Sequence, residues 1–254
     1  MKKLNLLFFA LILVISSCSK KDSSTSTNTT PPQTCVLATM SKGGYSETYV
    51  YNAAGQLTKR QIKETPTGNM IEDTLSYDSK GRLWYIVLTG VGNYRVLTYN
   101  TAGNLTQITE YSNYSQSANY TYSTTGQGQI TTVYYHDKTS TMDHTILVYD
   151  GNGNVTKSTD YDANGNTLGY TKYVYDNKNN NYNSYFKFMY SAISFANWGQ
   201  NNCTSIVVCD PSGSPLETDT YKYTYGSNNY PLTSSLSTTT GITENDTYTY
   251  NCHN

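Results

Sequence analysis

Residues that could bind a metal or catalyse a reaction are few and scattered along this chain. The three histidines, His136, His144 and His253, stand at separations that match no metal-ligand spacing. The sequence has no Gly-x-Ser-x-Gly turn, no His-Glu-x-x-His pair and no phosphate-binding loop. We therefore predict a protein that is not an enzyme and that carries no metal and no cofactor.

One segment matches the opening of a calcium-binding loop. Residues 160–165 read Asp-Tyr-Asp-Ala-Asn-Gly, which places oxygen ligands and a glycine at the spacing of an EF-hand. The twelfth position is Thr171, where such a loop requires glutamate. An Asp that starts a tight turn explains the same residues, and we favour a structural turn.

Cys18 has the clearest predicted chemistry. Lys2 and Lys3 precede an apolar run over residues 4–15, which is shorter than the about 20 residues of a spanning helix and is typical of a secretory signal. The Ile-Ser-Ser-Cys that ends at Cys18 resembles the bacterial lipobox, in which a diacylglycerol is attached to the cysteine and the chain is cut before it. We predict a signal peptide over residues 1–17 and lipidation of Cys18.

Residues 18–34 are predicted to be the lipidated cysteine and a flexible tether, because small polar residues and a Pro pair cannot bury apolar surface. The Ser-Lys-Lys-Asp over residues 19–22 resembles the surface-export signals of Bacteroidota-type lipoproteins. We expect an outer-membrane lipoprotein that faces the cell surface. A periplasm-facing orientation is the alternative.

Four further cysteines follow in a chain whose export permits disulfides. Cys203 and Cys209 flank a five-residue strand pattern, which would separate their Cα atoms by about 20 Å, too far for a disulfide. Cys35 and Cys252 mark the two ends of the ectodomain and would meet if the sheet closes. We favour a Cys35–Cys252 disulfide, with Cys203 and Cys209 free or joined only across a bend.

The composition indicates a sheet that is rich in tyrosine and low in charge. The chain has 27 Tyr against 5 Phe and 2 Trp, charged residues make up 14% and the net charge is -1. A protein with no basic stripe is not expected to bind nucleic acid. Tyrosine side chains need partners or water for their hydroxyls, which favours a half-exposed sheet.

A tyrosine-marked pattern repeats along the chain. Strong copies start at Tyr49, Leu75, Tyr99 and Tyr149, weaker copies at Tyr122, Tyr161, Tyr175, Cys209 and Tyr225, and a truncated copy at Tyr250. Alternation, as in Tyr221, Tyr223 and Tyr225, places rings on one face of a strand. An Asp or Asn then starts a turn and a Gly three positions later fits a G1 bulge. Each repeat predicts one hairpin, in a meander of roughly 16 to 20 strands.

The copy Tyr77-Asp78-x-x-Gly81-Arg82-Leu83 resembles the YD or Rhs-type repeat, and the likeness extends over most of residues 45–254. With the lipoprotein leader, the chain resembles uncharacterised Bacteroidota lipoprotein families with a porin-like domain. That resemblance implies an all-β antiparallel meander over residues 35–254, curled or closed into a barrel, without an established activity. A membrane-spanning porin is not expected, because residues 58–64 carry charge on both faces of a strand.

An aromatic insertion interrupts the repeats at residues 183–202. Phe186, Met189, Tyr190 and Ile193 stand at helical spacing, and Ser184 suits the start of a short helix. One interpretation is a helix or loop that plugs one end of the sheet. The other is an aromatic ligand platform that uses Tyr190 and Trp198.

A surface-anchored, non-enzymatic binding or scaffold module is indicated by the predicted tether, by the repeats and by the tyrosine-lined strand faces. Its expected partners are the membrane, through the lipid, and a polysaccharide or protein ligand. The alternatives are a periplasm-facing structural or assembly lipoprotein and a glycan-acting enzyme.

Overall fold

The computed structural model describes residues 34–253 except 91, 127, 137–140 and 181–194. No helix among these residues is long and apolar enough to cross a membrane. The strands of the described part are β1 (Thr34–Lys42), β2 (Tyr45–Tyr51), β3 (Leu57–Glu64), β4 (Met70–Tyr77), β5 (Leu83–Val87), β6 (Tyr94–Tyr99), β7 (Leu105–Ser112), β8 (Ser115–Thr124), β9 (Ile130–Tyr135), β10 (His144–Tyr149), β11 (Val155–Tyr161), β12 (Thr167–Asn179), β13 (Asn201–Cys209), β14 (Pro215–Tyr225), β15 (Pro231–Thr238) and β16 (Thr243–His253). One 3₁₀ turn, η1 (Phe195–Asn197), precedes β13.

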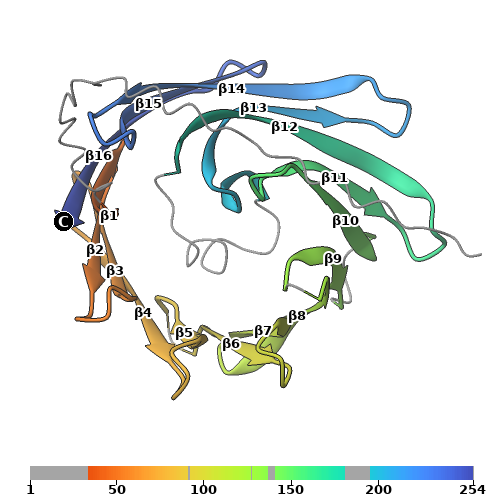
Figure 1. Ribbon diagram of the computed structural model, residues 1–254, viewed down its shortest axis with the longest axis horizontal. Helices are drawn as coiled ribbons and strands as arrows, with labels where there is room; N and C mark the ends of the chain where they lie inside the picture. The colour runs from red at the N-terminus through yellow and green to blue at the C-terminus, as the bar shows by residue number, and fades with distance from the viewer. Residues whose placement is uncertain (1–33, 91, 127, 137–140, 181–194, 254) are drawn as a thin grey trace, which may run out of the picture. The chain divides into compact units, whose positions relative to one another are not determined.

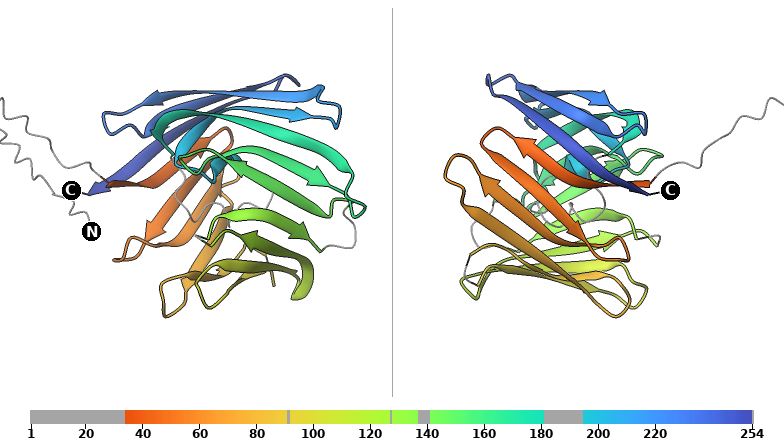
Figure 2. Two further views of the ribbon diagram at one scale, coloured as in Figure 1. Left: turned by 45° about the vertical axis from the view of Figure 1, so that its right-hand side comes forward. Right: turned by 90° about the vertical axis from the view of Figure 1, so that its left-hand side faces the viewer.

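These strands form a closed antiparallel barrel in which each strand pairs with its neighbour in the chain. Figure 1 shows the strands following one another around a ring. The ring closes where β1 pairs with β16, and both views of Figure 2 show these two strands side by side. The predicted all-β meander is therefore confirmed, and closure removes the exposed sheet edges that an open array would have.

A disulfide lies at the closure. Cys35 is opposite Cys252 in the register of β1 and β16, and the two sulfurs are bonded at 2.04 Å. This is the pair that the sequence favoured. Cys203 and Cys209 are free, buried thiols at opposite ends of the strand pattern that separates them.

The repeat motif forms the predicted turn. In the copy at Asp78, the backbone amide of Gly81 donates to the carbonyl of Asp78 at 2.9 Å, and Gly81 has a φ of +76°. The Asp78 carboxylate accepts the amides of Lys80 and Arg82, both at 2.9 Å. The pairing of β4 with β5 shifts by one residue beside this turn, as a G1 bulge requires.

The strong repeat turns all lie at one end of the barrel, because each connects an even-numbered strand to the next odd-numbered one. We call this the repeat end. The weaker copies at Tyr161 and Cys209 fall in the β11–β12 and β13–β14 hairpins, which lie at the opposite end. At Tyr175 the turn is replaced by the long connection from β12 to β13.

Tyrosine rather than phenylalanine marks the repeat because its hydroxyl forms a hydrogen bond that links adjacent hairpins. Hydroxyl groups of the repeat tyrosines donate to a backbone carbonyl of an earlier strand, and in every bond below except that of Tyr51 the acceptor is the first residue of that strand. The bonds are Tyr51 to Leu37 (2.8 Å), Tyr77 to Leu57 (2.7 Å), Tyr99 to Leu83 (2.6 Å), Tyr149 to Ile130 (2.7 Å), Tyr175 to Val155 (2.9 Å) and Tyr250 to Pro231 (2.8 Å). Each such bond contributes about 0.5–1.5 kcal/mol. Burial raises the pKa of Tyr99 to about 12, which keeps this donor protonated.

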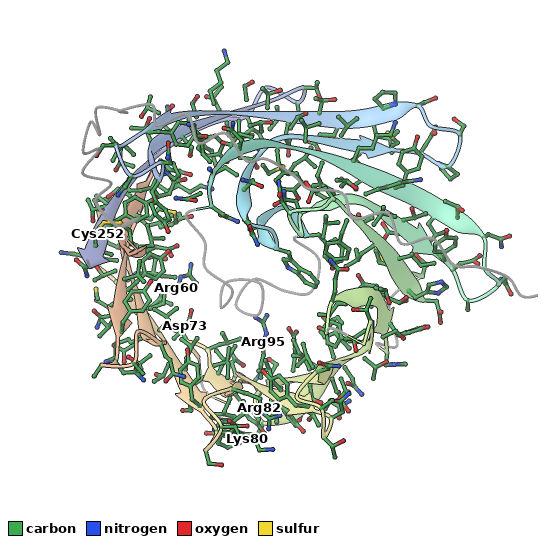
Figure 3. All side chains as sticks on the ribbon, viewed as in Figure 1. Arg60, Asp73, Lys80, Arg82, Arg95 and Cys252 are labelled. Carbon is green, nitrogen blue, oxygen red and sulfur yellow. A yellow bond between two sulfur atoms is a disulfide. The ribbon has the colours of Figure 1, made fainter. Side chains whose placement is uncertain are left out.

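The inner wall is apolar near the repeat end and carries charge further in. Arg60 on β3 donates to Glu47 on β2 through Nε and Nη2, at 2.7 and 2.6 Å, and to Asp73 on β4 through Nη1 at 3.1 Å. Glu47 is 0% exposed and Asp73 is 4% exposed. Figure 3 shows Arg60, Asp73 and Arg95 on the inner side of the ring. This ion triad satisfies charges that would be costly to bury alone.

Candidate functional site

A row of aromatic side chains lies on the outer face of β5, β6, β7 and the hairpin after them. We call it the aromatic row. Its members are Trp84, Tyr85, Tyr94, Tyr111 and Tyr114. Trp84 is 43% exposed and Tyr114 is 71% exposed. The intervening tyrosines are half-buried and stand apart from the residues that form the barrel core.

Strand pairing brings these rings together. Tyr94 and Tyr111 are opposite each other in the register of β6 and β7, and their rings stack with centroids 4.3 Å apart and an interplanar angle of 12°. Tyr85 reaches Tyr94 diagonally across β5 and β6 at 5.4 Å, and Trp84 lies 5.3 Å from Tyr85. Cross-strand and diagonal neighbours of this kind are within contact range of large rings. The row is therefore continuous over three strands.

Tyr114 completes the row from a strained position. Asn113 and Tyr114 form the two-residue connection between the paired Ser112 and Ser115. Both have positive φ, 49° for Asn113 and 62° for Tyr114. Bulky residues are rarely found there, where Gly and Asn are favoured. Backbone strain at an exposed aromatic side chain is a reason to look for a function.

Charge is excluded from the face that carries the row. The charged residues of β5, β6 and β7 are Arg95 and Glu110. They pair with each other on the inner wall, where Arg95 Nε lies 2.7 Å from Glu110 Oε1. Polar groups beside the row are uncharged: Gln107 Nε2 donates to the Thr109 hydroxyl at 3.0 Å. The arrangement places aromatic rings beside amide and hydroxyl groups.

Tyr94, at the centre of the row, is uncharged at physiological pH. Crowding among the rings raises the pKa of Tyr94, first by removing water and then through the neighbouring Tyr111, Tyr85 and Tyr114 hydroxyls. Its phenol therefore stays protonated and can donate as well as accept a hydrogen bond.

The aromatic row contains none of the site residues that were predicted from the sequence. Trp198 is half-buried and packs edge-on against Phe195, with ring centroids 4.9 Å apart. Its indole N–H is buried and has no hydrogen-bond partner among the described residues. Tyr190, the predicted helix around it and Ser184 lie outside the described residues, as does Cys18. The structure thus gives no geometry for a Tyr190–Trp198 platform.

The sequence carries a partial signal for the aromatic row. Counting alternate positions along residues 94–97 places Tyr94 on the face opposite Arg95. The same count places Tyr111 opposite Glu110. The row itself depends on the register between strands, which the repeats do not encode.

A second ring cluster lies on β9–β11. In the strand register His144 pairs with Tyr134 on β9 and with Tyr161 on β11, and its ring centroid lies 5.6 and 4.9 Å from theirs. Its Nδ1 lies 2.8 Å from Asp143 Oδ2. Tyr134 is exposed like Trp84 but stands outside the aromatic row. It is therefore a matched control for substitutions in the row.

The described residues contain no group of three or more side chains that could hold a metal. The carboxylate of Asp162, in the segment that matches a calcium loop, accepts the amides of Asn164 and Asn166 at 2.9 and 2.8 Å. The hydrogen bond from the Asn166 side chain, and then these backbone bonds, lower the pKa of Asp162. The residues form the turn that we favoured.

No protein-family model matches this chain, and no curated protein matches it. Among solved structures, a porin-like protein from Bacteroides uniformis aligns with a TM-score of 0.54 and 17% identity, over 85% of this chain and 96% of that one. A porin-like protein from Bacteroides vulgatus aligns at 11% identity and a TM-score of 0.37, over 86% and 99% of the two chains. A TcdB2–TccC3–Cdc42 complex aligns at 12% identity and a TM-score of 0.34, over 80% of this chain and 14% of that one. The first similarity shows that the two proteins share a fold.

Proposed function

We propose that this protein is a lipid-anchored cell-envelope protein that binds a neutral glycan, without chemical turnover, on the aromatic row. The observation that carries the proposal is the continuous set of four rings, with Tyr114 beside them, on an outer face from which charge is excluded.

The geometry suits sugar rings better than a charged ligand. A pyranose presents an apolar C–H face that packs on aromatic rings, and hydroxyl groups at its edge that bond to amides and hydroxyls. The row crosses β5, β6 and β7, about 10 Å at the usual spacing between strands, and Tyr114 extends it. It can therefore contact more than one sugar ring in succession. A neutral chain would meet no charged group on these strands.

The cellular location in this proposal rests on the lipobox at Cys18 and the preceding apolar run. The shared fold with a porin-like Bacteroides protein is compatible with an envelope protein. A lipid at Cys18 and the polar stretch after it would hold the barrel near the outer membrane, on the cell surface, where external glycans are reached.

Affinity electrophoresis of the full-length protein in detergent tests glycan binding. Gels that contain starch, xylan or a neutral β-glucan should retard the wild type for at least one polysaccharide. Trp84→Ala and Tyr94→Ala should each weaken binding about tenfold, because truncating a central aromatic contact costs about 1–2 kcal/mol. Tyr134→Ala, on the neighbouring ring cluster, should bind like the wild type. Equal losses in all three variants, or no retardation by any glycan, would contradict the proposal.

Protease shaving of intact cells tests the location separately. Loss of the ectodomain, with a periplasmic control protein intact, is the expected result. Protection until the outer membrane is breached, in a protein that the same protease digests once exposed, would instead support the periplasm-facing alternative.

A further inference from the structure

A cavity of about 170 Å³ opens on the inner face of the barrel, beside β1 and β13–β16. Its walls combine aromatic and charged side chains: Lys42, Tyr221, Tyr223, Glu244, Asp246 and Tyr248. An apolar cavity of about 150 Å³ holds a benzene molecule, so the space suits a ligand of a few heavy atoms. The aromatic row lies on the outer face of β5–β7, so the cavity is a separate site.

The aromatic wall comes from alternate residues of β14 together with β16. The rings of Tyr221 and Tyr223 are nearly parallel, with centroids 6.4 Å apart. Tyr248 is buried, and its hydroxyl lies 2.8 Å from that of Ser234. The faces of such rings attract cations, most strongly where water is excluded.

The charge of the cavity is negative. Lys42 forms an ion pair with Glu244 and also attracts Asp246, so one lysine stands against two carboxylates on the wall. Asp246 accepts the Ser234 and Tyr248 hydroxyls through Oδ2, at 3.2 and 3.1 Å. Its Oδ1 is buried and has no hydrogen-bond partner among the described residues.

A neighbouring carboxylate adds to this charge. Asp219 lies on β14 two residues before Tyr221, and its Oδ1 is also buried without a partner among the described residues. Asp219, Glu244 and Asp246 all raise the pKa of Tyr221, after the effect of burial. Three carboxylates therefore act on the cavity against the one lysine on its wall.

We propose that this cavity binds a small organic ammonium ion, with its cationic group over the tyrosine rings and its charge balanced by Asp246. The evidence is the coincidence of an open cavity, tyrosine side chains on its wall and a carboxylate whose Oδ1 has no donor among the described residues. Burial raises the pKa of Asp246, and a bound cation removes the cost of ionising it there.

Calorimetric titration of the full-length protein in detergent with choline is the test. Its neutral isostere, 3,3-dimethyl-1-butanol, has the same shape without the charge. Choline should bind at least tenfold more tightly than the isostere. Equal affinity for the two compounds, or no choline binding up to about 10 mM, would overturn the proposal.

Two substitutions locate the site. Asp246→Asn keeps an acceptor for Ser234 and Tyr248 and removes the charge, so it should weaken choline binding at least tenfold while the thermal midpoint is unchanged or higher. Tyr221→Leu should weaken binding because the ring face is lost. Glu72→Gln removes a carboxylate that pairs with Lys59 outside the cavity, and should bind like the wild type. Unchanged affinity in Asp246→Asn, with the fold intact, would refute the assignment.

Discussion

Replacing Arg60 by Met should destabilise the barrel strongly, because it leaves two buried carboxylates without their shared counter-ion. Arg60 makes two bonds to Glu47 and one to Asp73, and both acids are almost completely buried. Removing one member of a buried ion pair costs about 3–5 kcal/mol. At about 2–4 °C per kcal/mol for a domain of this size, the thermal midpoint should fall by roughly 6–20 °C.

Thermal and urea unfolding, followed by circular dichroism, measure this loss. The matched control is the triple variant Glu47→Leu/Arg60→Met/Asp73→Leu, which replaces the whole triad by apolar side chains. It should be clearly more stable than Arg60→Met, since apolar replacements of buried ion networks are often neutral or stabilising. An Arg60→Met protein within about 1 kcal/mol of the wild type would refute the reasoning, and would mean that water reaches the two carboxylates.

Three further predictions concern the turns and the closure. Tyr114→Gly should stabilise the fold by about 1 kcal/mol, because the positive φ at this position suits glycine, and it should weaken glycan binding because a ring is lost. Urea unfolding measures the stability and affinity electrophoresis measures the binding. A variant that loses stability would contradict the strain argument. Hydrogen bonds from Arg82 hold the pKa of Asp78 below its usual range, so Asp78 stabilises the protein above about pH 4 and this contribution is lost as pH falls through the lowered pKa. Asp78→Asn should therefore unfold more easily than the wild type at pH 7, and the difference should shrink as the pH falls from about 4 through the lowered pKa, whereas a difference that does not change with pH would count against the ion pair. The Cys35→Ser/Cys252→Ser variant opens a loop with a sequence separation of 217 and should lose about 2–5 kcal/mol in urea unfolding, while equal stability would show that strand pairing alone closes the barrel.

The fold followed from the sequence because each repeat encodes its hairpin locally. Asp78 supplies the acceptor that forms the turn, Gly81 adopts the positive φ, and the alternation around Tyr221 selects the inner face. Closure was not fixed by the repeat: the sequence allowed a curled sheet or a barrel, and the Cys35–Cys252 pair was expected only if the sheet closed, as β1 and β16 show that it does.

The candidate site depended on information that is not local. Tyr94 and Tyr111 are 17 positions apart in the sequence, and they stack because the β6–β7 register pairs them. A shift of one residue would turn either ring to the other face. Arg60 and Asp73 meet for the same reason, so their pairing could not be predicted from composition or from the repeat.

The fluorescence of Trp84 during glycan titration tests the central claim most directly. The chain has 2 Trp, and Trp198→Phe leaves Trp84 as the sole tryptophan while removing a buried N–H that has no partner among the described residues. With the polysaccharide that retards the protein in gels, Trp84 emission should shift saturably, with the half-saturation found by electrophoresis. Glycan binding that leaves Trp84 emission unchanged would show that the glycan binds elsewhere and would contradict the proposed function of the aromatic row.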